Sequence, residues 1–101
     1  MKNLQKKVEK FVKKYNFNHE PEINALDLVS EIGEVVKKIL KTTNYGKEKP
    51  RYRQEIKNEV GDVFYSLINL SNHYNINLEE ALDFVLEKYE KRLQKGSAGS
   101  E

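Results

Sequence analysis

The sequence predicts an all-α fold, an antiparallel helical bundle of about four helices, and three observations support this prediction. Apolar residues recur at three- and four-residue spacings in four segments, as they do in a helix with one buried face. Residues typical of turns separate these segments. No segment alternates apolar and polar residues as a half-buried strand does. We expect a single domain over residues 1–95 and a flexible tail over residues 96–101, where glycine and serine are typical of a linker.

The first predicted helix covers about residues 2–15, and the second begins at Pro21 and runs to about residue 41. Proline is common in the first turn of a helix, which places this start. Lysines occupy the other faces of the first helix, and we interpret them as a solvated face in preference to a nucleic-acid patch. The two apolar stripes consist of Leu4, Val8, Phe11, Val12 and Tyr15, and of Leu28, Val29, Ile32, Val35, Val36, Ile39 and Leu40.

The third and fourth predicted helices follow a loop punctuated by Gly46 and Pro50. The third covers about residues 52–74. The fourth starts after Asn77, a good N-cap residue, and Glu80 stands at the capping-box position behind it. Their apolar stripes consist of Ile56, Val60, Val63, Phe64, Leu67 and Leu70, and of Leu78, Leu82, Val85, Leu86, Tyr89 and Leu93.

Composition narrows the classes of function. The 18 basic and 16 acidic side chains give a net charge of +2, which provides no general attraction to nucleic acid or to a membrane. The absence of cysteine excludes disulfides and thiolate metal sites. No segment has transmembrane length and the N-terminus lacks the apolar core of a signal peptide, so we expect a cytoplasmic protein. At 38% hydrophobic residues the core is modest, and we expect homo-oligomerisation to bury a further face.

Two acidic pairs stand beside the most hydrophobic segments. The stretch "SEIGEVVKK" carries Glu31 and Glu34, and "NEVGDVFYSL" carries Glu59 and Asp62. At 100° per residue each pair lies on one stripe that borders the apolar side of its helix, so packing of the two helices can bring the four carboxylates together. Carboxylates that converge repel one another unless they take up protons or bind a cation. Ligands that are all oxygen suit Mg²⁺ or Mn²⁺, and Mg²⁺ is commonly completed by substrate phosphates.

Simpler explanations of the same residues stay open. Acidic side chains at helical spacing are often a solvated face, and Lys38 lies four residues after Glu34 as an ion-pair partner. Gly33 and Gly61 each stand between two acids inside a helix, where glycine costs about 1 kcal/mol relative to alanine. Close approach of neighbouring backbones beside the acids would explain them, and so would tight helix packing without any chemistry.

The two acidic motifs, "SEIGEVVKKILK" and "NEVGDVFYSLINLSN", resemble those of the MazG family of nucleoside triphosphate pyrophosphohydrolases, whose fold is all-α. The resemblance extends over about residues 23–92. It implies that Glu31, Glu34, Glu59 and Asp62 bind Mg²⁺ and perform catalysis. It also implies cleavage of a nucleoside triphosphate between the α- and β-phosphates, to a monophosphate and pyrophosphate, by a homodimer or homotetramer.

The last predicted helix both matches and departs from the family. Lys88 and Arg92 match basic positions there, and the resemblance makes them phosphate contacts, with Lys38 as a further candidate. The family often has asparagine where this chain has Leu86. Asn69, Asn72 or another polar group would have to replace that contact.

Two other functions remain as alternatives. A phosphoribosyl-ATP pyrophosphatase would keep the carboxylates and change the substrate. A non-catalytic helical interaction module would use the lysine-rich first helix and leave the acids as solvated surface. Four aromatic residues in or beside loops could stack on the base of a nucleotide: Phe17, His19, Tyr45 and Tyr52. For each of them, packing over a helix end is the better explanation.

Overall fold

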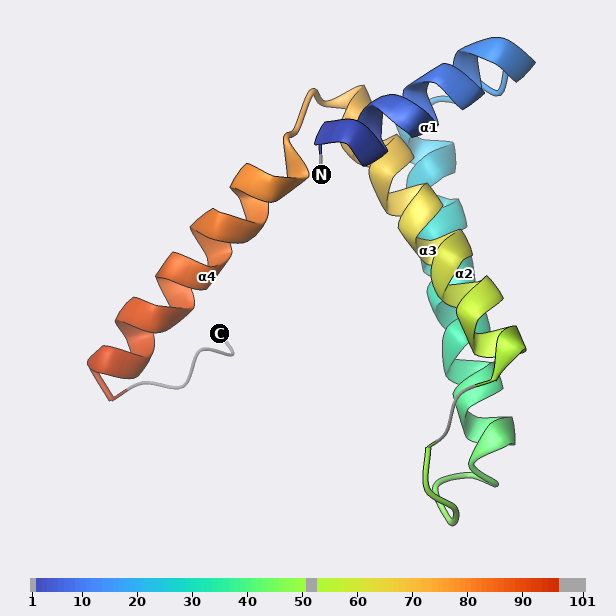
Figure 1. Ribbon diagram of the computed structural model, residues 1–101, viewed down its shortest axis with the longest axis vertical. Helices are drawn as coiled ribbons and strands as arrows, with labels where there is room; N and C mark the ends of the chain where they lie inside the picture. The colour runs from blue at the N-terminus through green and yellow to red at the C-terminus, as the bar shows by residue number, and fades with distance from the viewer. Residues whose placement is uncertain (1, 51–52, 97–101) are drawn as a thin grey trace.

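The computed structural model describes residues 2–50 and 53–96, and these form helices joined by short connections (Figure 1). The helices are α1 (Lys2–Tyr15), α2 (Pro21–Thr42), α3 (Gln54–His73) and α4 (Leu78–Gln94). Their bounds agree closely with the predicted ranges, and no strand occurs among the described residues. The prediction of an all-α fold with four helices is therefore confirmed. Most of the predicted tail, residues 97–101, lies outside the described residues, as does Tyr52.

Local sequence accounts for the helix ends. Pro21 occupies the first turn of α2, and the Asn77 side chain caps α4 by accepting a hydrogen bond from the Glu80 backbone N–H at 3.1 Å. Asn16, directly after α1, has a φ value of 57°, and Asn75, two residues after the end of α3, has a φ value of 53°. Asparagine tolerates this left-handed conformation better than most residues, so it turns the chain out of each helix.

Helices α2 and α3 pack against each other as an antiparallel pair, and α1 packs across α3 (Figure 1). Val12 of α1 and Ile68 of α3 are buried where these helices meet. Gln5 links α1 to the end of α3: its side chain donates to the Asn72 Oδ1 at 3.1 Å and accepts from the Leu78 backbone N–H at 2.9 Å. Asn72 also donates to the Gln5 carbonyl, so its amide links α1 to α3.

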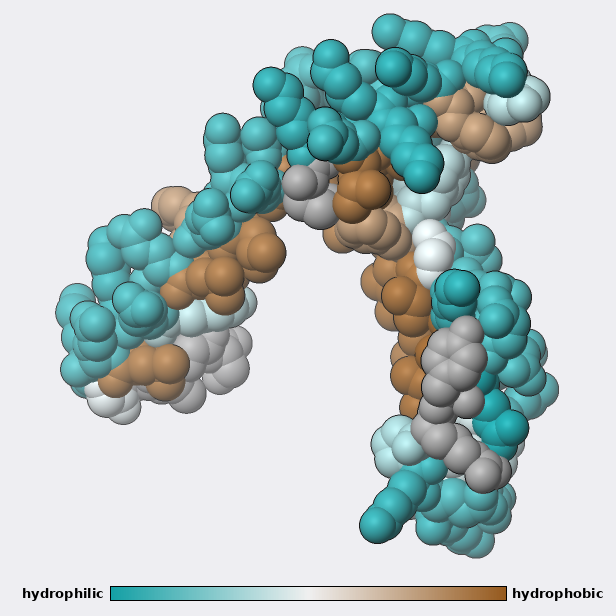
Figure 2. Space-filling view, in the orientation of Figure 1, coloured by the Kyte–Doolittle hydropathy of each residue, from teal (hydrophilic) through white to brown (hydrophobic). Residues whose placement is uncertain are grey.

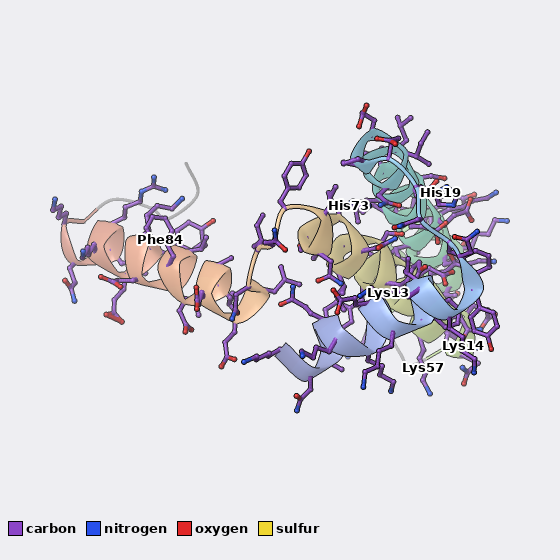
Figure 3. The ribbon with its side chains drawn as sticks, turned by 90° about the horizontal axis from the view of Figure 1, so that it is seen from above. Lys13, Lys14, His19, Lys57, His73 and Phe84 are labelled. Carbon is purple, nitrogen blue, oxygen red and sulfur yellow. The ribbon has the colours of Figure 1, made fainter. Side chains whose placement is uncertain are left out.

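Helix α4 stands apart from the other three, in contrast to the predicted four-helix packing (Figures 1 and 3). The left-handed turn at Asn75 directs it away from α2 and α3, so each chain forms an arch with the α2–α3 pair as one limb and α4 as the other. The radius of gyration is 16.5 Å, whereas a compact domain of this length has about 13 Å. A periodic apolar stripe shows that a face of α4 needs covering, but it does not say which chain covers it.

Apolar side chains gather on the inner side of both limbs of the arch (Figure 2). Many large apolar residues of α2, α3 and α4 remain exposed in the single chain, including Phe84, which Figure 3 labels on α4. The most exposed are Leu26, Val29, Val36, Val60, Leu82, Phe84, Leu86 and Leu93. None of the described helices combines the length and the apolarity that crossing a bilayer requires.

The two glycines between the acids do not mark a close backbone approach within the chain. A Cβ atom built on Gly33 or Gly61 would meet no other heavy atom within 4 Å, apart from those of its own helix turn. Both explanations derived from the sequence, close approach beside the acids and tight helix packing, are therefore wrong for a single chain.

Candidate metal centre

The register of the α2–α3 pair places polar residues of the two helices opposite one another. At one end, the Asn69 Nδ2 donates to the Asn24 Oδ1 at 3.4 Å. One helical step further, Asp27 and Ser66 line the same cleft, and one step beyond that Glu31 meets Asp62. Each advance of three or four residues along α2 is matched by an equal advance backward along α3, because the helices are antiparallel.

Three carboxylates converge at this point of the register. Glu31, Glu59 and Asp62, here called the acid triad, each offer an oxygen atom, and these atoms lie within 4.8 Å of one another. Glu31 and Glu59 are half-buried, and Asp62 is exposed. Glu34 lies one turn beyond Glu31 on α2, half-buried and outside the triad. The structure thus brings together three of the four acids named from the sequence.

The surroundings of Glu31 raise the pKa of its carboxyl group above the ordinary value of 4.5. Partial burial is the largest cause, followed by the negative charge of Asp62 and a hydrogen bond with that carboxyl group. The charges of Glu59 and Glu34 act in the same direction. The metal-free chain therefore holds a carboxylate whose charged form is disfavoured, and a bound divalent cation would relieve this. An all-oxygen donor set fits Mg²⁺ or Mn²⁺.

The raised pKa of Glu31 predicts how stability depends on pH in EDTA. Between 4.5 and the raised value, the folded chain binds more protons than the unfolded chain, so the free energy of unfolding falls as the pH rises through that window. Glu31→Gln removes this part of the dependence, because glutamine does not titrate. Urea unfolding of both proteins over pH 4 to 8 measures it. Parallel curves for the two proteins would contradict the assignment.

A cleft of about 300 Å³ lies beside the acid triad and adds residues that the sequence did not single out as site residues. Asp27, Tyr65 and Ser66 line it together with Glu31 and Asp62. By helical spacing, Asp27 lies on the same stripe as Glu31 and Ser66 on the same stripe as Asp62. A helical wheel drawn from the sequence could therefore have indicated both residues. Tyr65 lies beside the acidic stripe of α3, and in the sequence nothing distinguishes it from an ordinary aromatic residue.

The basic residues named from the sequence lie at other places. Lys38 is half-buried on α2, one turn beyond Glu34. Lys88 and Arg92 belong to α4, which extends away from the α2–α3 pair, so the single chain does not bring them to the acid triad (Figure 1). The Lys88 ammonium lies 5.5 Å from the centre of the neighbouring Tyr89 ring.

Comparison with known proteins identifies the family. The profile of the MazG nucleotide pyrophosphohydrolase domain matches residues 19–97, which include α2, α3, α4 and the whole acid triad. The chain belongs to the MazG family. As a MazG protein it is a hydrolase of the nucleotide pyrophosphohydrolase class.

A solved structure agrees with the MazG assignment. The crystal structure of YpjD from Bacillus subtilis, described there as a candidate pyrophosphatase, shares 32% sequence identity with this MazG chain at a TM-score of 0.75. The similarity covers 91% of this chain and 94% of YpjD. No curated protein sequence gives a significant match. The two agreements show the family and the fold and support the pyrophosphohydrolase class.

Proposed function

We propose that the protein is a Mg²⁺-dependent pyrophosphohydrolase that cleaves a nucleoside or deoxynucleoside triphosphate between the α- and β-phosphates. The products are the nucleoside monophosphate and pyrophosphate. The acid triad is the observation that carries the proposal, since its three carboxylate oxygens lie within 4.8 Å of one another beside an open cleft. The membership of the MazG family points to the same class of reaction.

The residues divide the work as follows. Glu31, Glu59 and Asp62 would hold the metal, with Glu34 as a further acid at its edge. Bound Mg²⁺ supplies charge neutralisation of the phosphate oxygens and lowers the pKa of a water molecule. Glu34 lies near enough for its charge to act on Glu31, and it is our candidate for accepting the proton of the attacking water. Four acids surround the site and would repel the negative charge that develops on the departing pyrophosphate. Basic side chains are therefore needed to stabilise that charge.

We further propose that two copies of the chain close their arches on one another. The exposed apolar residues on the inner side of both limbs support this, as does the large radius of gyration. In such a homodimer α4 of one copy would cover the α2–α3 pair of the other. Lys88 and Arg92 would then contact the phosphates bound at the partner's acid triad, and a pair of dimers would give the tetramer. A cytoplasmic location, where nucleotides are made, stays a prediction.

Thermal unfolding with added metal tests the site separately from the substrate. We expect the melting temperature to rise with Mg²⁺ concentration, because a cation that binds only the folded chain stabilises it by mass action. The Glu31→Gln variant should respond little. Asp83→Asn, an exposed carboxylate on α4 outside the cluster, serves as the control and should keep the full response. Equal responses of all three proteins would contradict the assigned metal site.

Pyrophosphate release from a panel of nucleotides tests the reaction. The panel contains the canonical and modified nucleoside triphosphates, their deoxy forms and phosphoribosyl-ATP, each with and without EDTA. Metal-dependent release from triphosphates supports the proposal. Release from phosphoribosyl-ATP alone would show that this compound, and not a nucleoside triphosphate, is the substrate. Release from none of the compounds would overturn the enzymatic function.

A further inference from the structure

A second pocket of about 230 Å³ opens beside the cleft of the acid triad. The two share Asp27, Tyr65 and Ser66 as a common wall. The pocket, here called the side pocket, is completed by Phe17, His19, Asn24 and Asn69. The connection between α1 and α2 supplies Phe17 and His19, and Figure 3 labels His19 there. Because of the shared wall, one ligand can extend from the acid triad into the side pocket.

Asn24, which lines this pocket, carries an unused hydrogen-bond donor. Its side chain is 3% exposed, and its Oδ1 accepts the hydrogen bond from Asn69. Its Nδ2 atom is buried and has no partner. A buried amide without a partner is costly, since it has given up its bonds to water without replacement. Among the described residues this atom calls for an acceptor that the chain itself does not supply.

The aromatic side chains of the pocket suit a flat ligand. Phe17 and Tyr65 both pack against Phe11, with ring centres 5.9 Å and 6.1 Å from it. This holds the two pocket rings in one aromatic cluster, although Phe17 remains 47% exposed. An exposed ring held by its neighbours offers a face for stacking at little entropic cost, and nucleobases stack on such rings.

The distance between the two subsites matches the shape of a nucleotide. Asn24 precedes Glu31 by seven residues on α2, which corresponds to a rise of about 10.5 Å along the helix. A ribose and the α-phosphate lie between the base and the leaving phosphates. The triphosphate can therefore lie at the acid triad while the base lies at Asn24. At about 230 Å³ the side pocket is smaller than the typical range of about 300–1,000 Å³ for drug-sized ligands, which favours a single-ring base.

We propose that the side pocket binds the nucleobase of the substrate and that the Asn24 Nδ2 donates a hydrogen bond to a carbonyl oxygen of that base. This inference rests on the proposed function and names its substrate class, the pyrimidine nucleoside triphosphates. Every pyrimidine base carries a carbonyl oxygen, whereas adenine carries none. The donor of Asn24 thus discriminates against adenine nucleotides, because they leave it without a partner.

The Asn24→Asp variant isolates the role of that one atom. Aspartate keeps an oxygen to accept from Asn69, replaces the donor by an acceptor and adds a negative charge, for which a control variant is needed. We expect kcat/KM for UTP to fall about tenfold or more while kcat/KM for ATP changes little, so that the ratio of the two falls toward one. The melting temperature should still rise with Mg²⁺. Asn18→Asp introduces the same charge at an exposed residue outside the side pocket and should keep the preference of the wild type.

Direct binding keeps the inference testable if hydrolysis fails. Calorimetric titration with UMP and AMP reports base recognition without any reaction, and we expect the wild type to bind UMP more tightly and Asn24→Asp to lose the difference. Asn24→Leu serves the same purpose if the aspartate variant does not fold. Wild-type protein that binds both nucleotides equally would overturn the inference, and so would an equal loss for UTP and ATP in the variant. Absence of pyrophosphate release with an intact UMP preference would overturn the proposed reaction alone.

Discussion

Replacing Asp62 by asparagine is expected to lower the rate of pyrophosphate release by about three orders of magnitude. Asp62 lies in the acid triad and its charge acts on Glu31, so the substitution removes one ligand and one negative charge from the site. A hard cation binds an amide oxygen more weakly than a carboxylate. The loss should therefore appear in turnover with saturating nucleotide as well as in the apparent affinity for Mg²⁺.

Stability distinguishes this loss of activity from unfolding. Asp62 is exposed and repels the other acids, so Asp62→Asn should leave the metal-free protein at least as stable at pH 7 as the wild type. Urea unfolding in EDTA measures the free energy of unfolding, and a coupled pyrophosphate assay measures the rate. Asp83→Asn is the matched control on α4 and should change neither. A variant at Asp62 with nearly wild-type turnover would contradict the proposed centre.

The second large effect is expected from mixing two inactive variants. Asp62→Asn lacks an acid of the triad, and the double variant Lys88→Ala/Arg92→Ala lacks the basic residues of α4. If these groups act across the dimer interface, a mixed dimer contains one site with both defects and one site with neither. Random exchange makes half of the dimers mixed, so the mixture should regain about a quarter of the wild-type activity.

The same mixture distinguishes basic residues that act across the dimer interface from basic residues that act within their own chain. If the basic residues served the acids of their own chain, each site of a mixed dimer would carry one defect and no activity would return. The subunits are exchanged by dilution and reconcentration, and sedimentation verifies that dimers form. Mixing Asp62→Asn with Glu59→Gln is the control, since both defects lie in the triad. That mixture leaves every site with a damaged triad and should stay inactive.

The sequence predicted the helices and both acidic stripes because these features depend on spacing within one segment. The register between α2 and α3 could not be obtained in this way. It depends on which faces meet, and it is recognised from the pair Asn24 and Asn69 at one end and Glu31 with Asp62 further along. Asn24 was missed because a lone asparagine near the start of a helix looks like ordinary polar surface.

The position of α4 was beyond prediction for a different reason. Its apolar stripe shows that a face requires covering, but a stripe is the same whether its own chain or another copy covers it. For this reason Lys88 and Arg92 can be named as basic candidates from the sequence, whereas the sequence does not say which copy's acid triad they would serve. Gly33 and Gly61 likewise have open surroundings within one chain.

The small buried core affects how long an unpaired chain survives in the cell. Among the described residues, Val12 and Ile68 are the buried apolar side chains, and neither is fully shielded from solvent. A freshly synthesised copy that has not yet met another therefore has little to protect it from proteases and chaperones. Under the proposed pairing, survival of the chain depends on its abundance. Nucleotide cleavage would then rise more steeply than in proportion to gene expression, with almost none below a threshold.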